Sequence, residues 1–559
     1  MKKLEALVWI LICGFLLSCS KKDSPEPDSP DGPPVDNSSL SFSHLTVNGA
    51  FNGFDYYGLV DKPVLKITFS KPIDKNTVSE AMSLKSKSGV AVRLTVGYED
   101  NDNTIVVTPS DALAYITPYV FNIQTSLKSS SGRTLLSAIT LNLTTGFDPA
   151  DKFPRISDEE LLTLVQRQTF KYFWDFGHPV SGMARERDSS GDIVTTGGTG
   201  FGVMAIITAI HRGFVTREEG LARIQKITTF LKNKAQRFHG AFPHWLNGST
   251  GAVQPFSTKD NGADLVETSL LMQGLLTARQ YFNGAGQEAD LRNDINSLWN
   301  AVEWSWFRKD NANVLYWHWS PDYNWDMNLP VRGWNEALIT YVLAASSSSH
   351  AIPKSVYENG WANNSSFRNG NTYFSVQLPL GPAMGGPLFF SHYSFMGINP
   401  MGLSDTYANY ETQNKAHAQI NYQYCKSNPK GFYGYSGDCW GLTASDDING
   451  YKAHEPTNDN GVISPTAALS SFPYTPEESM KALKFFYYKL GDKVWKEYGF
   501  VDAFSLHEPW FASSFLAIDQ GPIIVMIENY RSGLLWNLFM SCPEVKTGMR
   551  TLGFSGPQL

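Results

Sequence analysis

The spacing of hydrophobic and polar residues follows one pattern over residues 40–147 and another from residue 153 onward. Between residues 40 and 147, short β-branched runs partly alternate with polar residues, and turn-forming clusters separate them. Such runs predict strands, and their spacing predicts an all-β sandwich. The predicted strands cover residues 64–69, 90–96, 104–108, 119–123 and 139–144. We assign this domain a spacer or positioning role.

From residue 153 to 559 the pattern is helical. Ser157 and Thr216 each precede a glutamate by three residues, which is the capping-box signature of a helix start. No fixed short period repeats, which argues against a solenoid. The predicted helices cover residues 157–176, 200–213, 217–237, 263–282, 288–308, 334–346, 403–426, 464–472, 476–490, 515–531 and 533–541.

Several of these helices are apolar on every side yet begin with polar residues. Asp264 and Glu267 lie on one face of such a helix, just before Leu270. Acids in a first turn also suit the helix dipole, so one pair alone proves little. Alternating amphipathic and apolar helices with long loops predict an (α/α)6 toroid, also called an (α/α)6 barrel, over residues 153–559. Its inner helices would direct one set of ends toward a common funnel.

The first 39 residues have the character of a leader and a tether. Residues 1–18 contain two lysines and a short apolar run, which indicates a signal peptide. Residues 16–19 (LLSC) resemble a bacterial lipobox, which implies acylation at Cys19, and residues 20–23 resemble export tags of Bacteroidetes lipoproteins. The alternative is an ordinary secretory leader. Residues 19–39 predict a disordered tether.

The composition narrows the function further. The net charge of −7 offers no basic stripe for nucleic acid, so we expect no nucleic-acid partner. Aromatic residues make up 13% of the chain, and Trp and Tyr faces suit the apolar surfaces of sugars. Histidines are scattered and no CxxC pair occurs, so we expect no metal. Whether Cys425 and Cys439 form a disulfide stays open.

Carboxylates that converge on a rigid ring beside aromatic residues suit the cleavage of glycosidic bonds. One carboxylic acid protonates the leaving oxygen, and another carboxylate activates water or attacks directly. Five sequence motifs, taken together, resemble those of one protein family. They are residues 169–175 (TFKYFWD), 182–188 (GMARERD), 263–268 (ADLVET), 332–337 (RGWNEA) and 517–522 (AIDQGP).

With these motifs, residues 153–550 resemble the bacterial glycoamylase-like family, and more narrowly glycoside hydrolase family 144, the endo-β-1,2-glucanases. The segment 40–147 resembles bacterial Ig-like modules. The resemblance implies an (α/α)6 barrel, no cofactor and hydrolysis with inversion. It also implies that Glu336, Asp264 and Glu267 are the acids that matter.

We expect Glu336 to be the general acid, with a pKa raised by partial burial beside Trp334. Asp264 or Glu267 would be the base, its relay or a clamp on sugar hydroxyls. The alternative for each is an ordinary first-turn acid. Further substrate-binding candidates come from the loops and helix starts, although a buried Trp, a loop His, a self-paired charge cluster or an N-cap would explain each of them singly. They are Trp174, His178, Arg185, Glu186, Asn335, His392, Trp440, Glu455, Trp510 and Asp519.

The sequence thus predicts a lipoprotein that hydrolyses a β-glucan, most simply an endo-β-1,2-glucanase with an inverting mechanism. We expect an oligosaccharide or polysaccharide substrate, a monomer, and contact with the outer membrane only through the lipid anchor, on the cell surface or the periplasmic face. The alternatives are a non-catalytic glycan-binding lipoprotein, a polysaccharide lyase, and a hydrolase of another linkage.

Overall fold

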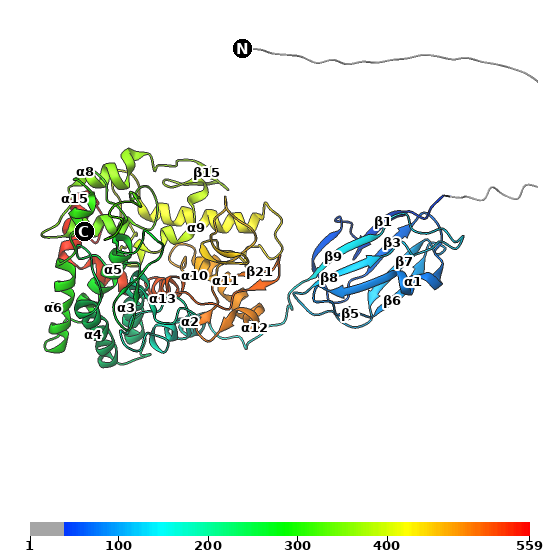
Figure 1. The fold of residues 1–559 in the computed structure, drawn as a ribbon, viewed down its shortest axis with the longest axis horizontal. Helices are drawn as coiled ribbons and strands as arrows, with labels where there is room; N and C mark the ends of the chain where they lie inside the picture. The colour runs from blue at the N-terminus through cyan, green and yellow to red at the C-terminus, as the bar shows by residue number, and fades with distance from the viewer. Residues whose placement is uncertain (1–37) are drawn as a thin grey trace, which may run out of the picture.

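The structure is a computed structural model that describes residues 38–559. The predicted signal peptide, Cys19 and nearly all of the predicted tether lie outside the described residues. A β-rich domain and a larger helical domain lie side by side, joined near residue 148 (Figure 1). Within the described part of the chain, no helix is long and apolar enough to cross a membrane.

The N-terminal domain is a sandwich of two sheets around one apolar core. One sheet has the order β1-β3-β7-β6, and the other has the order β2-β9-β8-β4-β5. Ile67, Phe121 and Leu141 face inward and are fully buried. Four of the predicted strands are present as β3, β7, β8 and β9, the predicted strand 90–96 is divided between β5 and β6 in different sheets, and β1, β2 and β4 were not predicted. The strand bounds are β1 (Phe42–Val47), β2 (Asp55–Leu59), β3 (Leu65–Phe69), β4 (Met82–Ser86), β5 (Ala91–Val92), β6 (Leu94–Glu99), β7 (Thr104–Pro109), β8 (Pro118–Ile123) and β9 (Ile139–Thr145).

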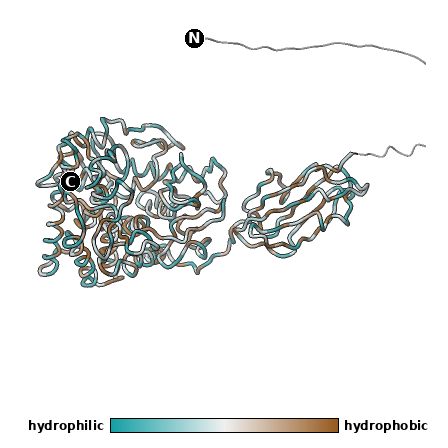
Figure 2. Tube along the Cα trace, in the orientation of Figure 1, coloured by the Kyte–Doolittle hydropathy of each residue, from teal (hydrophilic) through white to brown (hydrophobic). Residues whose placement is uncertain are grey.

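The C-terminal domain is built from helices whose hydrophobic segments run through its interior (Figure 2). Nearly every residue of α3, α5, α7 and α13 is buried, whereas α2, α4 and α6 bury one side only. The longer helices are α2 (Asp158–Trp174), α3 (Thr196–His211), α4 (Arg217–Asn233), α5 (Leu265–Tyr281), α6 (Gln287–Asn300), α7 (Leu338–Ser346), α9 (Tyr410–Ser427), α10 (Pro465–Leu469), α11 (Pro476–Lys484), α13 (Ala517–Ser532), α14 (Leu534–Met540) and α15 (Pro543–Leu552).

The central pair of inner helices, α3 and α5, crosses at glycines. A Cβ atom at Gly200 would lie 2.2 Å from the carbonyl oxygen of Leu270, and one at Gly274 would lie 2.2 Å from that of Gly200. Only glycine permits this approach, because the two backbones touch. The crossing holds the first turns of α3 and α5 together, and both turns carry groups of the site described below.

Several helix boundaries differ from the prediction. The predicted helix 403–426 begins only at Tyr410, because Asn409 caps it and residues 403–409 form bends and isolated bridges. The predicted helix 334–346 begins at Leu338, which leaves Glu336 in the preceding turn. Helix α15 was not predicted. Its apolar residues occupy one stripe only, and Pro543 opens it.

The two domains contact each other at several points. The ring of Tyr57 in β2 stacks on His507, with ring centroids 4.1 Å apart. Gly58 lies so close to the Tyr433 ring that a Cβ atom there would stand 2.4 Å from it. In the connecting segment, the backbone N–H of Lys152 donates to the carbonyl of Tyr488 over 2.7 Å.

Candidate active site

Asp264, the N-cap of α5, is a fully buried acid of the helical domain. Its Oδ1 accepts the backbone N–H of Glu267 over 2.9 Å, and its Oδ2 accepts Nδ1–H of His244 over 2.9 Å. Nε2 of His318 lies 3.4 Å from the same Oδ2. Although burial opposes ionisation, His244 and His318 hold the pKa of Asp264 well below its usual value. Asp264 is therefore ionised throughout the neutral range.

The two histidines carry the matching positive charge. Although burial opposes their charged forms, Glu267 and Asp264 raise the pKa of His244 to about 9. In the same way, Asp260 and Asp264 raise the pKa of His318 to about 10. A short antiparallel pair brings His318 to this place, because β13 (Ala263–Asp264) pairs with β14 (His318–Trp319) and sets Asp264 opposite His318.

Glu267 lies in the first turn of α5, between His244 and the start of α3. Its Oε2 accepts the backbone N–H of Gly197 over 2.7 Å, and its Oε1 lies 4.0 Å from Nε2 of His244. A Cβ atom at Gly197 would stand 2.7 Å from this carboxylate, so glycine is required for the approach. Burial raises the pKa of Glu267, while His244 opposes the rise.

Glu336 is the third of the predicted acids. It lies in the turn before α7, where its carbonyl oxygen accepts a hydrogen bond from the Ser394 hydroxyl. Burial raises the pKa of its carboxyl to about 7, and the charges of Glu267 and Asp264 act in the same direction. A carboxyl of raised pKa and the ionised Asp264 thus act on each other electrostatically, a combination that acid–base catalysis uses.

A second charged cluster surrounds Arg187. Its Nε–H donates to Glu186 over 3.0 Å, and its Nη1–H donates to Asp446 over 3.1 Å. The backbone N–H of Asp446 in turn donates to Asp502 over 2.6 Å. Next to Asp502 lies Asp519, near the start of α13, and burial raises the pKa of both carboxyls, to about 7 for Asp502. Two buried acids side by side hold a proton between them, because both cannot ionise.

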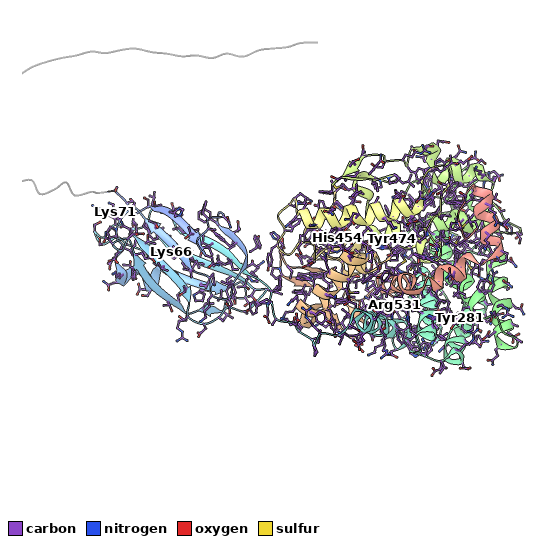
Figure 3. All side chains as sticks on the ribbon, turned by 180° about the vertical axis from the view of Figure 1, so that it is seen from behind. Lys66, Lys71, Tyr281, His454, Tyr474 and Arg531 are labelled. Atoms are coloured by element: carbon purple, nitrogen blue, oxygen red, sulfur yellow. The ribbon has the colours of Figure 1, made fainter. Side chains whose placement is uncertain are left out.

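Tyr393 lies between the two clusters. Burial first, and then the charges of Asp519, Glu336 and Glu267, raise the pKa of its hydroxyl. The Tyr393 hydroxyl therefore stays protonated at neutral pH, and charges from both clusters raise its pKa. The two clusters therefore belong to one acidic region at the ends of the inner helices. Arg531, at the far end of α13, bonds instead to Glu159 of α2 (Figure 3).

Three of these residues have the composition of a cation site. One ligand atom each from His244, Asp260 and Asp264 lies within 4.8 Å of the others. The same carboxylates, however, face His318, whose Nε2 lies 3.2 Å from Oδ2 of Asp260. The histidine thus compensates the charge that a cation would otherwise balance. The absence of a metal stays a prediction.

The comparisons with known proteins agree with this geometry. Residues 328–543 match the glycoamylase family, described as putative glucoamylase, and residues 59–145 match a bacterial Ig-like domain. An endo-β-1,2-glucanase from Chitinophaga pinensis, solved with sophorotriose and glucose, is 54% identical; the match covers 72% of this chain and all of that one, with a TM-score of 0.71. The chain belongs to the bacterial glycoamylase-like family. Its relatives are of the glycoside hydrolase family 144 type.

Two relatives from Parabacteroides distasonis extend the comparison within the glycoamylase-like family. A β-1,2-glucanase structure is 40% identical, covering 92% of this chain and 74% of that one with a TM-score of 0.70. An exo-β-1,2-glucooligosaccharide sophorohydrolase acting at the non-reducing end is 48% identical over 420 residues, which is 71% of this chain. The match spans only 58% of that relative's length.

Within this glycoamylase-like domain, the structure brings several predicted site residues together. Glu336, Asp264 and Glu267 influence one another's ionisation, as described above. Glu186 and Asp519 join the Arg187 cluster, with Asp519 buried. Their catalytic and binding roles stay predictions.

Three predicted sugar contacts need correction because their side chains are buried. Trp440 is 0% exposed and donates its Nε1–H to the carbonyl of Glu478, so it presents no face to a sugar. His392 is also buried beside Ser471, and burial lowers its pKa to about 3. His178 is buried against Asp192. These three residues support the fold.

The remaining candidates make mainly local contacts. Trp174 lines a hollow between α2 and the α3–α4 turn, and the guanidinium of Arg223 covers its ring. Arg185 packs over Phe176, 4.5 Å from the ring centroid. The other three keep local contacts: Asn335 caps the turn at Ala337, Glu455 accepts the hydroxyl of Thr457, and Trp510 lies near the domain boundary.

Sequence reasoning assigned no role to Asp260, His244, His318 or Asp502. His244 follows the apolar pair at 242–243, and His318 stands between two tryptophans. A histidine among aromatic residues is a weak signal, since buried histidines often occur there. Nothing local in the sequence shows that both histidines face Asp264.

Proposed function

We propose that this protein hydrolyses β-1,2-linked glucans with inversion of the anomeric configuration. The observation that carries the proposal is the buried carboxyl of Glu336, whose pKa is raised to about 7 by burial first and then by the charges of Glu267 and ionised Asp264. The relatives from Parabacteroides distasonis and Chitinophaga pinensis act on β-1,2-glucans or their oligosaccharides. We take the proposed linkage from those relatives and the choice of Glu336 as the acid from the structure of the site.

In this mechanism Glu336 gives its proton to the glycosidic oxygen as the C1–O bond breaks. A water molecule attacks C1 from the opposite face and loses a proton to a carboxylate. We assign Glu267 as that base or as the end of its relay. Asp264 suits a positioning role, because the Glu267 N–H, His244 and His318 all engage its carboxylate.

We also propose that the helical domain closes into an (α/α)6 toroid. Its inner helices would be α3, α5, α7, α9, α10 and α13. Four consecutive contacts support the ring: α7 packs on α5, α5 on α3, α3 on α13, and α13 on α10. The acids lie at one set of helix ends, where such a ring has its funnel.

The chain-length mode and the location are proposals too. We propose an endo mode, and a lipid anchor at Cys19 that would hold the protein on the outer membrane, at the cell surface or the periplasmic face. Labelled glucan products separate the modes: an endo enzyme releases a mixture of lengths early, whereas an exo enzyme releases sophorose alone. Palmitate labelling of wild type and Cys19→Ala tests the anchor.

A reducing-end assay on β-1,2-, β-1,3-, mixed-linkage and α-1,4-glucans tests the activity. We expect release from the β-1,2-glucan by wild type, and a loss of about 10²- to 10⁴-fold in Glu336→Gln. Glu477→Gln is the matched control, because Glu477 is exposed in the first turn of α11. Equal binding by wild type and Glu336→Gln without release by either would instead indicate a non-catalytic glycan-binding protein.

A further inference from the structure

A groove runs along the boundary between the Ig-like domain and the helical domain. It encloses about 580 Å³, which is within the range of about 300–1,000 Å³ typical of ligand pockets. The Ig-like side contributes Tyr57 and Asn142, and the helical side contributes His507 and Trp510. Pockets at domain boundaries are a common place for ligands.

The groove continues toward the acids. A second hollow of about 510 Å³ lies over Arg187, Asp446 and Tyr451. Trp510, in β22 (Trp510–Phe511), lines both hollows. The hairpin of β17 (Ala444–Asp447) and β18 (Gly450–Ala453) separates them, with Ile448 on one side and Asp447 on the other.

The second hollow borders the acidic region itself. Arg187 in its floor bonds Glu186, and the carbonyl of Glu186 accepts the backbone N–H of Ala517, at the start of α13. A glucan chain that extends from the Arg187 cluster over this hollow therefore passes Tyr451 and Trp510 before it reaches the Ig-like domain.

The lining suits a neutral sugar chain. Tyr57 is 41% exposed and Tyr451 is 50% exposed, so both side chains have accessible surface, although one face of the Tyr57 ring is stacked on His507. The Asn142 amide donates to Asp55 over 2.7 Å, which sets an ordered polar pair on the groove wall. Lys87 is the one basic residue of the first hollow, against Asp55 and Glu508, so an anionic ligand would meet net repulsion.

Contacts between the two domains fix the positions of the two walls of the groove. The stacking of Tyr57 on His507 is reinforced by Tyr433, whose backbone N–H donates to Nδ1 of His507 over 3.2 Å. In the neutral ring this leaves the proton on Nε2, as a donor toward a ligand. Lys489 also donates to the carbonyl of Pro149 and pairs with Asp151 in the connecting segment.

We propose that this boundary groove binds the distal part of a β-1,2-glucan whose cleaved bond lies at Glu336. The Ig-like domain thereby becomes part of the substrate site. The inference rests on the proposed function and adds a second domain to it. Aromatic contacts of this kind contribute about 0.5–1.5 kcal/mol each, which corresponds to about a twofold to tenfold change in affinity.

Length-dependent kinetics test the groove. Tyr57→Ala and Trp510→Ala, in the full chain, should each lower kcat/KM on a long linear β-1,2-glucan by about twofold to tenfold and leave a short oligosaccharide of the same linkage unaffected. Tyr57→Phe and Trp510→Phe keep a ring and should retain most of the long-chain advantage. Tyr115→Ala is the matched control, because Tyr115 is also 41% exposed on the Ig-like domain but does not line the groove.

Binding in a Glu336→Gln background gives a second readout by calorimetry, with melting temperatures to confirm folding. Unchanged affinity and kinetics for the long glucan in both alanine variants would overturn the groove proposal while wild type remains active. Equal losses on long and short substrates would also overturn it, because they would indicate damage to the acids. If wild type neither cleaves nor binds any β-1,2-glucan, the proposed function itself fails.

Discussion

Nδ1 of His244 lies 2.9 Å from Oδ2 of the fully buried Asp264. Since the pKa of His244 is raised to about 9 and that of Asp264 is lowered, this contact is an ion pair at neutral pH. The pair compensates one buried negative charge and leaves Glu267 and Glu336 as the acids whose pKa values are raised. The histidine thus helps decide which carboxyl of the cluster keeps a proton.

The pH dependence of activity should show the proton on Glu336. A general acid works only while protonated, and the pKa of this carboxyl is raised to about 7. We therefore expect kcat/KM to fall about tenfold per pH unit well above pH 7. The measurement is the pH profile of kcat/KM, which reports the ionisation of the free enzyme, with melting temperatures at each pH. A kcat/KM that stays level from pH 7 to pH 9 would contradict the assignment.

Replacing His318 should destabilise the helical domain. His318→Gln leaves Asp260 and Asp264 buried without their imidazolium partner, which costs about 3 kcal/mol in the free energy of unfolding. Chemical denaturation at neutral pH measures this. His211→Gln, at a half-exposed histidine 3.8 Å from Glu528, is the control and should cost much less.

The same pair predicts the direction of the pH effect on stability. The folded pKa of His318 is raised from 6.5 to about 10, so its contribution is fully present below about pH 6.5 and is lost as the pH rises through 10. Wild type should therefore lose stability from pH 7 to pH 10 more steeply than His318→Gln. Parallel curves for the two proteins would argue against the charged histidine.

The glycine crossing of α3 and α5 should not tolerate a side chain. Gly200→Ala would press a methyl group against the backbone of Leu270, and we expect a loss of about 1–3 kcal/mol or more in the free energy of unfolding. Gly97→Ala is the control, because a Cβ atom there would have its nearest neighbour at 3.9 Å. Thermal and urea unfolding compare the two variants. Equal stability would show that the helices can separate without cost.

Chelation should leave the enzyme active. Because His318 already faces Asp260 and Asp264, we expect no loss of hydrolysis after dialysis against EDTA and no gain on adding Ca²⁺, Mg²⁺ or Zn²⁺. Elemental analysis of the purified protein accompanies the assay. A stoichiometric metal, with activity that returns only when it is restored, would assign His244, Asp260 and Asp264 a ligand role instead.

The acids of the site could be named from their position at helix starts, because a first turn and its periodicity are local properties of the chain. Asp264 and Glu267 were found in that way. The partners of those acids could not be found, since Asp264 meets His244 and His318 only after the β13–β14 pair forms. Trp440 was predicted to stack on a sugar because the sequence gives the residue type but not the surrounding residues that bury it.

The sequence by itself determined the division into a β domain and a helical domain, the glycine-rich start of α3 and the acids before the apolar helices. These follow from short-range sterics and from the spacing of apolar residues. Only the tertiary structure decided which histidines face the acids, how burial shifts the pKa of each carboxyl and how the Ig-like domain meets Trp510. These depend on burial and on contacts between residues far apart in the chain, which no local pattern encodes.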